Sequence, residues 1–303
     1  MVTRTKTRFA GYDCIKLENE ALVLWVTHSV GPRIIGLALR GGENLFAVLP
    51  DDTVACPGIG SFSFRGGHRL WVAPENPRRT YLPDDKPVVV TEIDDGVCAT
   101  QPVESQTGIQ KSLAITLPGS DPRVAVDHTL YNRGHSPVDL APWAITQLKP
   151  GGVAVLPQPT SPADEYGVLP NRQFALWPYT PMNSPHITWG DRYVFVEATL
   201  RDGALKIGYP NPAGWLGYAV DGTFFVKHAA YQSSADYFDR ASSSECYCKD
   251  QFIELETLGP RTTLFPGGSV THREVWAIYA DVSLRPDEAM AQTLVGMLAL
   301  ETG

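Results

Sequence analysis

Residues 123–131, Arg-Val-Ala-Val-Asp-His-Thr-Leu-Tyr, carry the pattern that decides the fold. Apolar and polar side chains alternate there with a period of two, so Val124, Val126 and His128 share one face of a strand. Asp127 lies on the opposite face. One buried face and one wet face are typical of antiparallel sheets, whereas strands of a parallel sheet are apolar on both faces.

Similar short apolar runs recur along the chain, rich in Val, Ile, Thr and aromatic residues and bounded by Gly, Pro, Asp or Asn. They predict further strands. These runs are 21–26, 34–39, 137–145, 193–199, 223–230, 251–258 and 270–280.

The C-terminal segment is the one that predicts a helix. Pro286 suits a first helical position, Asp287 and Glu288 suit the first turn, and residues 289–300 are rich in helix formers. We find no internal repeat of propeller or solenoid length and no Ser/Gly-rich linker. We therefore predict an all-β fold, a large antiparallel sandwich with a short C-terminal helix, forming a single domain over residues 1–303.

Composition limits the function classes. The chain has 303 residues, 43% hydrophobic and 19% charged, with a formal net charge of -8, so a nucleic-acid partner is not expected. No apolar stretch approaches the roughly 20 residues of a membrane span, and no signal sequence follows the basic N-terminus. We expect a soluble cytoplasmic protein with a small, uncharged partner.

The five cysteines are Cys14, Cys56, Cys98, Cys246 and Cys248. Their odd number, with no export signal, predicts reduced thiols. Cys246 and Cys248 would share one strand face, but a zinc site would need a second ligand pair. The sequence also lacks phosphate-binding, dinucleotide-binding, serine-hydrolase and zinc-protease motifs. We expect no metal and no cofactor.

Two stretches, 62–87 and 156–192, predict unusually long connecting loops dense in Pro, charge and aromatic residues. Within the first, Trp71 offers a flat apolar face for a sugar ring, and Arg69 and Glu75 can bond its hydroxyls. His68 adds a titratable imidazole. Alternatively, this is a structural loop with Trp71 in the core and His68 tying down the backbone.

The strand-like run 252–260 contains Glu254 and Glu256, which project from one face because they are two residues apart. In a cleft, mutual repulsion would raise one pKa and supply a base near neutrality. Facing water, the two glutamates would be ordinary surface charges. Both interpretations remain open from the residues alone.

Three further residues are weaker candidates. Lys227 ends the apolar run 223–226, and Trp143 stands opposite Leu140 on its strand, as either a core residue or a stacking platform. His128, on an apolar face, is expected to be a satisfied core histidine.

Several motifs together resemble the galactose mutarotase-like (aldose 1-epimerase) superfamily, whose fold is a large antiparallel β-supersandwich. The sequence is most similar to an uncharacterised domain-of-unknown-function family within it. The motifs are Gly31–Ile35, Gly66–Trp71 with Ala73–Glu75, Gly214–Trp215, Phe252–Pro260 and Pro266–Gly267.

The resemblance implies roles for several residues. Glu256, in a Leu-Glu-Thr context, looks like the family's general base, and His68, beside a Gly-Gly pair, looks like its sugar-binding histidine. The family's second histidine, its usual general acid, would fall near Trp143. This chain has tryptophan there instead.

We therefore predict a carbohydrate-binding, aldose epimerase-like protein that acts on the anomeric centre, with Glu256 as base and His68 or Lys227 as acid. The substrate-binding candidates are Arg69, Trp71, Glu75, Trp143, Lys227 and Glu254. A non-catalytic carbohydrate-binding or sensing protein is the first alternative. A polysaccharide lyase or hydrolase is the second, and hydrolysis would require another carboxylate across the bond.

Overall fold

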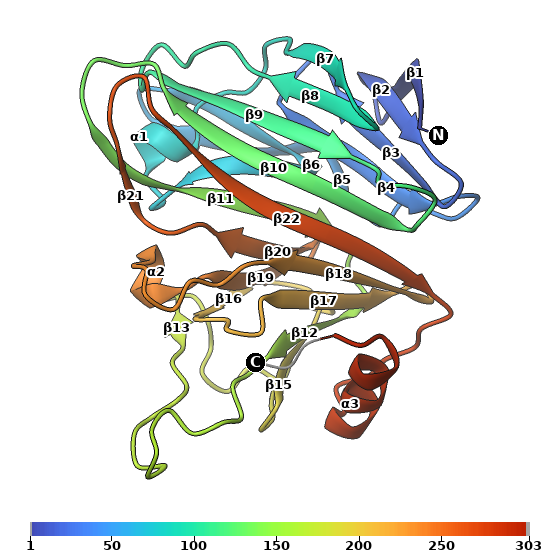
Figure 1. The fold of residues 1–303 in the computed structure, drawn as a ribbon, viewed down its shortest axis with the longest axis vertical. Helices are drawn as coiled ribbons and strands as arrows, with labels where there is room; N and C mark the ends of the chain where they lie inside the picture. The colour runs from blue at the N-terminus through green and yellow to red at the C-terminus, as the bar shows by residue number, and fades with distance from the viewer. Residues whose placement is uncertain (1, 301–303) are drawn as a thin grey trace.

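The computed structural model describes residues 2–300 and consists of two large antiparallel sheets stacked face to face (Figure 1). Within these residues the helices are short: α1 (Pro77–Thr80), α2 (Phe238–Ala241) and α3 (Glu288–Met297). The predicted all-β sandwich is confirmed. None of the helices in residues 2–300 has the length and hydrophobicity that a membrane span requires.

The first sheet has twelve strands. Ten of them lie in the order β1 (Thr3–Phe9), β2 (Tyr12–Glu18), β3 (Leu22–Thr27), β4 (Arg33–Leu39), β6 (Gly60–Ala73), β11 (Val138–Leu148), β20 (Ile253–Leu258), β19 (Ser244–Lys249), β16 (Ala204–Tyr209) and β13 (Ala175–Leu176). Off this path, β5 (Val48–Cys56) pairs with β6 and β21 (Thr262–Leu264) pairs with β11.

The second sheet has ten strands. Their order is β14 (Ile187–Trp189), β15 (Tyr193–Glu197), β12 (Val153–Pro157), β17 (Trp215–Val220), β18 (Thr223–Ala229), β22 (Ser269–Ala280), β10 (Arg123–Asn132), β9 (Ile109–Thr116), β8 (Gly96–Thr100) and β7 (Val89–Ile93). All eight strand-like segments predicted from the sequence form or overlap strands of the two sheets.

The main core lies between the sheets, where alternate residues of facing strands are buried. Val124 and Val126 of β10 are fully buried there together with His128. The predicted two-faced pattern of this strand is confirmed, because Asp127 on the other face remains partly exposed. All five cysteines are free.

Helix α3 packs on the outer face of the second sheet through Ala291 and Val295. It begins at Glu288, two residues later than predicted. The Asp287 side chain accepts a hydrogen bond of 3.0 Å from the Met290 backbone N–H, so Asp287 is the N-cap and Pro286 precedes it.

The stretch 62–87 is not one long loop as predicted, because residues 60–73 form the fourteen-residue strand β6. Arg65, Gly66 and Gly67 interrupt it with φ values of 59°, 87° and 70°. A Cβ on Gly66 would lie 1.9 Å from the Ala47 carbonyl oxygen, and one on Gly67 would lie 2.2 Å from that of Ile34. Only glycine permits this backbone approach.

The interruption at residues 65–67 puts Trp71 on the same face of β6 as Phe62 and Phe64. In a regular strand, Phe64 and Trp71 would lie on opposite faces because they are seven residues apart. Instead, the Trp71 ring packs against both Phe62 and Phe64, with centroid distances of 5.3 and 6.2 Å. The two halves of β6 thus build one aromatic cluster.

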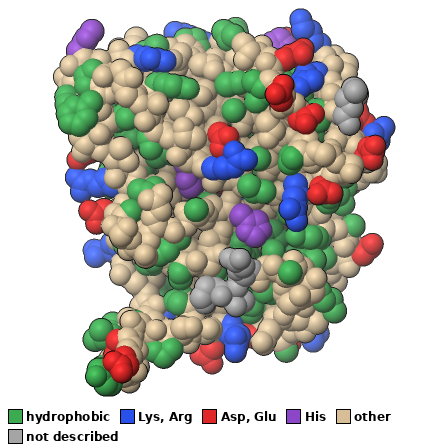
Figure 2. Space-filling view, in the orientation of Figure 1, with side chains coloured by type: hydrophobic (Ala, Val, Ile, Leu, Met, Phe, Trp, Pro, Cys, Tyr) green, Lys and Arg blue, Asp and Glu red, His purple; other side chains and the backbone are tan. Residues whose placement is uncertain are grey.

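The second predicted loop, 156–192, is mostly irregular, with only the end of β12 and the short strands β13 and β14 inside it. Its first part projects from the body at the lower left of Figures 1 and 2. Tyr166, Val168 and Leu169 in this stretch are exposed. On the face in Figure 2, acidic and basic side chains are interspersed rather than gathered into one patch. The later part of this stretch contributes to the candidate site.

Candidate functional site

The register of the central strands places several candidate residues on one face of the first sheet. Arg69 of β6 and Glu256 of β20 pair with the same residue of β11. Glu256 in turn pairs with Glu245 of β19. Two residues further along these strands, Trp71 of β6 pairs with Trp143 of β11. Side chains of directly paired residues point to the same face, so these strands build a continuous floor.

A cleft of about 430 Å³ opens over this face. Its charged lining residues are Asp52, Arg69, Glu75, Lys206, Lys249 and Glu254. Its aromatic lining includes Trp71, Tyr81, Trp143, Trp177, Tyr179 and Tyr247. Aromatic walls with convergent polar groups are typical of sites for small polar ligands.

The structure brings together most of the residues that the sequence singled out. Arg69, Trp71 and Glu75, from β6 and the segment after it, line the same cleft as Trp143 and Glu254. Arg69 of β6 and Glu254 of β20 are separated by more than half of the chain length. They come together because β11 pairs with both β6 and β20.

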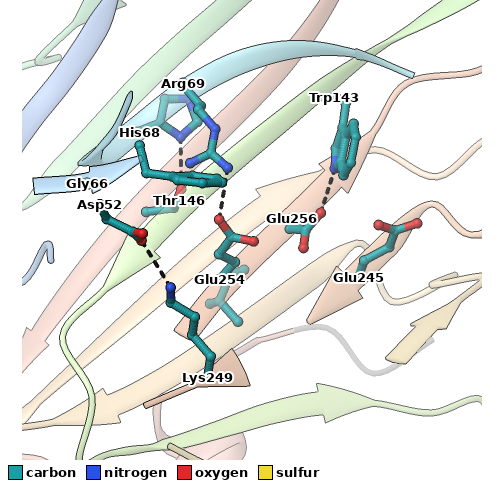
Figure 3. Close-up of polar contacts among 12 residues, drawn as sticks. Asp52, Gly66, His68, Arg69, Trp143, Thr146, Glu245, Lys249, Glu254 and Glu256 are labelled. Carbon is teal, nitrogen blue, oxygen red and sulfur yellow. Dashed lines mark hydrogen bonds and ion pairs between the residues drawn. The ribbon is translucent and has the colours of Figure 1, made fainter. Parts of the chain in front are cut away.

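Glu254 lines the cleft and has an unusual acidity. Its Oε1 lies 2.9 Å from the Arg69 Nη2 (Figure 3). Burial is the largest influence and raises the pKa of Glu254. The Arg69 charge lowers this pKa, whereas the neighbouring Glu256 raises it further. The resulting pKa of Glu254 is about 7. This carboxyl group can therefore both give and take a proton near neutrality.

Glu256 lies deeper than expected, because its side chain is fully buried and does not line the cleft. Its Oε2 accepts a hydrogen bond of 2.6 Å from the Trp143 Nε1–H (Figure 3). The same oxygen lies 2.9 Å from the Lys206 Nζ. Its Oε1 has no hydrogen-bond partner among residues 2–300. Trp143 and Lys206 therefore separate Glu256 from the open cleft.

Lys206 connects two buried carboxyl groups. Its Nζ lies 2.6 Å from Glu245 Oε2 as well as 2.9 Å from Glu256 Oε2. Burial lowers the pKa of Lys206, but the two glutamates outweigh burial and the pKa lies well above its ordinary value. Burial raises the pKa of Glu245 well above its ordinary value despite Lys206. Lys206 is therefore a permanent cation at the cleft floor.

The predicted position of His68 beside Glu256 is wrong. His68 alternates with Arg69 along β6, so its side chain lies on the inner face of the sheet, fully buried between the two sheets. Lys227 of β18 is also fully buried there, 3.0 Å from the Glu274 Oε1. Neither residue lines the cleft.

His68 belongs instead to a hydrogen-bonded chain between the sheets. The His128 Nδ1 lies 2.9 Å from the His272 carbonyl oxygen, which only accepts, so this nitrogen carries a hydrogen. In a neutral ring the His128 Nε2 then accepts from the His68 Nε2–H, 2.6 Å away. The His68 Nδ1 in turn accepts from the Thr146 hydroxyl at 2.9 Å. Burial lowers the pKa of both imidazoles, in agreement with neutral rings.

This inner cluster also contains a set of possible metal ligands. Donor atoms of His68, His128 and Glu274 lie within 4.8 Å of one another. However, the imidazole lone pairs take part in the hydrogen-bonded chain, and the Lys227 ammonium already neutralises Glu274. A divalent cation would add charge beside a buried lysine, which is unfavourable. We assign the cluster a structural role and confirm His128 as a core histidine.

Sequence reasoning missed several residues of the site. Lys206 is a lone charge in the apolar strand β16, and such a charge inside an apolar run is a recognisable signal. Trp177 and Tyr179 come from the irregular stretch whose aromatic content was noted. Glu245 lies beside Cys246 in β19, and nothing in its local sequence shows that it pairs with Glu256.

Several solved structures share this fold at low sequence identity. No protein-family model matches the sequence, and no curated protein matches it. A putative aldose 1-epimerase from Escherichia coli is 13% identical, with a TM-score of 0.55, and the match covers 92% of this chain and 100% of that one. A galactose mutarotase-like protein from Lactobacillus casei is 13% identical, with a TM-score of 0.57, covering 88% and 100%.

A TPR-domain-containing protein from Parabacteroides distasonis is 17% identical with a TM-score of 0.62. The match covers 90% of this chain but 48% of that protein, so the chain spans about half of its length. Together, these similarities show that the chain has the fold of galactose mutarotase-like proteins. The finer placement within an uncharacterised family stays a prediction.

Proposed function

We propose that the protein binds a sugar in the cleft and acts on its anomeric centre by acid/base chemistry, as an aldose epimerase-like protein. The observation that carries this proposal is Glu254, a cleft-lining carboxyl group with a pKa of about 7 beside aromatic walls. The shared fold supports the proposal but does not identify an activity.

Opening a pyranose ring moves two protons. One is delivered to the ring oxygen and another leaves the anomeric hydroxyl, and ring closure reverses both transfers. We propose that Glu254, in its protonated form, delivers the first proton. The second would pass to another carboxylate, for which Glu75 is available in the cleft wall.

In this proposal Glu256, expected to be the base, takes no direct part in the proton transfers, because Glu254 acts as the acid and Glu75 as the base. Glu256 is covered by Trp143 and Lys206, but its charge helps to raise the pKa of Glu254. Arg69 holds the carboxyl group in place. Tyr179, 46% exposed, offers a more accessible stacking surface than Trp71, which is 5% exposed.

A non-catalytic sugar-binding protein is the second candidate, and one observation favours it. Among residues 2–300, no histidine lines the cleft, so an imidazole acid is absent from it. The two candidates differ in whether bound sugar changes anomer faster than free sugar.

The test combines polarimetry of freshly dissolved aldoses with calorimetric titration of the same sugars. For an enzyme, Glu254→Gln should reduce the rate by about 10²- to 10⁴-fold with little change in affinity. Tyr179→Ala should instead weaken binding and spare the rate in the complex. Binding by the wild type without acceleration would favour the non-catalytic protein, and absence of binding would refute both.

A further inference from the structure

The charge of the cleft favours one class of sugar. Three cations, Arg69, Lys206 and Lys249, line it. Three carboxyl groups line it as well, and two more, Glu245 and Glu256, lie directly beneath it against Lys206. The net charge of this set runs from zero, when Glu245 and Glu254 are both protonated, to minus two, when all five are ionised. It does not become positive near neutral pH.

Each cation of the cleft already has a carboxyl partner. Arg69 pairs with Glu254 at 2.9 Å, and Lys249 pairs with Asp52 at 3.1 Å. Lys206 lies between its two buried glutamates. A phosphate or carboxylate on a ligand would therefore have to compete with these pairs, and it would meet the remaining negative charge of the cleft.

The aromatic faces beside these cations are also in use. The Lys206 Nζ lies 4.7 Å from the Trp143 ring centroid and 4.6 Å from that of Trp177. The Arg69 guanidinium carbon lies 4.2 Å from the Trp71 ring centroid. These contacts hold the cations against the walls and away from an anionic ligand.

Glu75 differs from the other carboxyl groups of the cleft. It is exposed, and residues 2–300 provide no ion-pair partner for it. It accepts a hydrogen bond from the Tyr81 hydroxyl, which fixes it beside an aromatic ring. Tyr179 lines the same cleft. An exposed carboxylate bonded to a tyrosine hydroxyl in an aromatic-lined cleft suits an ammonium group.

We propose that the cleft selects amino sugars, with a positively charged amine, over neutral sugars and over anionic sugars such as uronic acids and sugar phosphates, with Glu75 as the residue that recognises the amine. This proposal rests on the proposed sugar-binding function of the same cleft. It adds a charge preference that the fold does not determine.

The test is calorimetric titration at about pH 6.5, below the usual pKa range of an amine. The ligands are glucosamine, glucose, N-acetylglucosamine and glucuronic acid. N-acetylglucosamine controls for shape, because it carries a substituent at the same carbon without the charge. A partly exposed ion pair predicts that glucosamine binds about two- to fivefold tighter than glucose, and glucuronic acid binds weaker than both. Added salt should reduce the difference.

Glu75→Gln should abolish the preference for glucosamine over N-acetylglucosamine. Glu43→Gln is the matched control, because Glu43 is an exposed carboxylate outside the cleft, and it should keep the preference. Glucose binding without a preference for the amine, or a preference for glucuronic acid, overturns this inference and leaves the proposed function standing. If none of the four sugars binds, the proposed function fails and this inference fails with it.

Discussion

Lys206→Met tests the electrostatics beneath the cleft. The substitution keeps the length of the apolar stem but removes the ammonium group between Glu245 and Glu256. The side chains of all three residues are at least 95% buried, so water cannot replace the lost charge. Two buried carboxyl groups would face each other across β19 and β20 without a cation.

The size of the expected loss of unfolding free energy depends on whether Glu245 and Glu256 can be neutralised or hydrogen-bonded without Lys206. Removing one partner of a buried pair typically costs about 3 to 5 kcal/mol of unfolding free energy. Burial already raises the pKa of Glu245, so this group can bind a proton, and Glu256 keeps the Trp143 N–H. We therefore expect the lower end, about 3 kcal/mol at pH 7.

The loss of unfolding free energy in Lys206→Met should become smaller as the pH falls. Burial holds the folded-state pKa of Glu245 above its unfolded value, and losing Lys206 removes the cation that opposes this, so protonation of Glu245 relieves the penalty as the pH falls. The variant should approach the wild type near pH 5. In the wild type the pKa of Lys206 is raised, so its stabilising effect is complete below about pH 10 and is lost only as the pH rises through the folded value.

The assay is urea denaturation at pH 5 and pH 7, with Lys249→Met as the matched control. The Lys249 side chain is 23% exposed and its partner Asp52 is 18% exposed, so that loss should be about 1 kcal/mol or less at both pH values. An equal loss for both variants, or a Lys206→Met loss that does not change with pH, would refute the account of a buried cation between two carboxyl groups.

Three more substitutions test other parts of the structure. Glu254→Gln should remove from a ¹³C NMR titration the signal of the Glu254 carboxyl group, which titrates at about pH 7. Because folding raises this pKa, the stability due to its proton is present below about pH 4.5 and is lost as the pH rises through 7, and the variant should lack this pH dependence. Gly66→Ala should destabilise the fold by more than about 3 kcal/mol in thermal or urea unfolding, whereas Gly41→Ala, also at positive φ but with open space around it, should cost about 1 kcal/mol. Thr146→Val should cost about 1 to 2 kcal/mol, because the His68 Nδ1 loses its donor, yet leave sugar affinity unchanged, and a changed affinity would contradict the placement of His68 on the inner face.

The alternation of apolar and polar residues was enough to predict most strands. In β10 the period-two pattern coincides with burial between the sheets, so local sequence and tertiary packing agree. Local sequence does not show which strands lie next to one another in a sheet. Lys206 and Glu256 come from strands that are not adjacent in sequence, and their ion pair depends on that order.

The errors around β6 have one physical cause. The Gly66-Gly67 pair is typical of a loop, but here both glycines adopt left-handed conformations inside a strand that neighbouring backbone approaches closely. In a loop, consecutive side chains need not point to opposite faces, so the loop prediction allowed His68 and Arg69 to share one cleft. Once β6 is a strand, His68 must point away from the face that carries Arg69 and Trp71.

The most direct test of the sugar-binding cleft uses the tryptophan indoles as position-specific probes. The chain has 7 tryptophans, of which Trp71, Trp143 and Trp177 line the cleft. The remaining four are Trp25, Trp189, Trp215 and Trp276.

In a ¹⁵N–¹H correlation spectrum, titration with a sugar should shift the Nε1–H signals of the three cleft tryptophans, each assigned by substitution with Phe. The other four signals should stay in place and serve as internal controls. Concerted, saturable shifts confined to Trp71, Trp143 and Trp177 are the predicted result. Shifts confined to the other tryptophans, or no saturable shift with any sugar, would contradict the assignment of this cleft as a carbohydrate site.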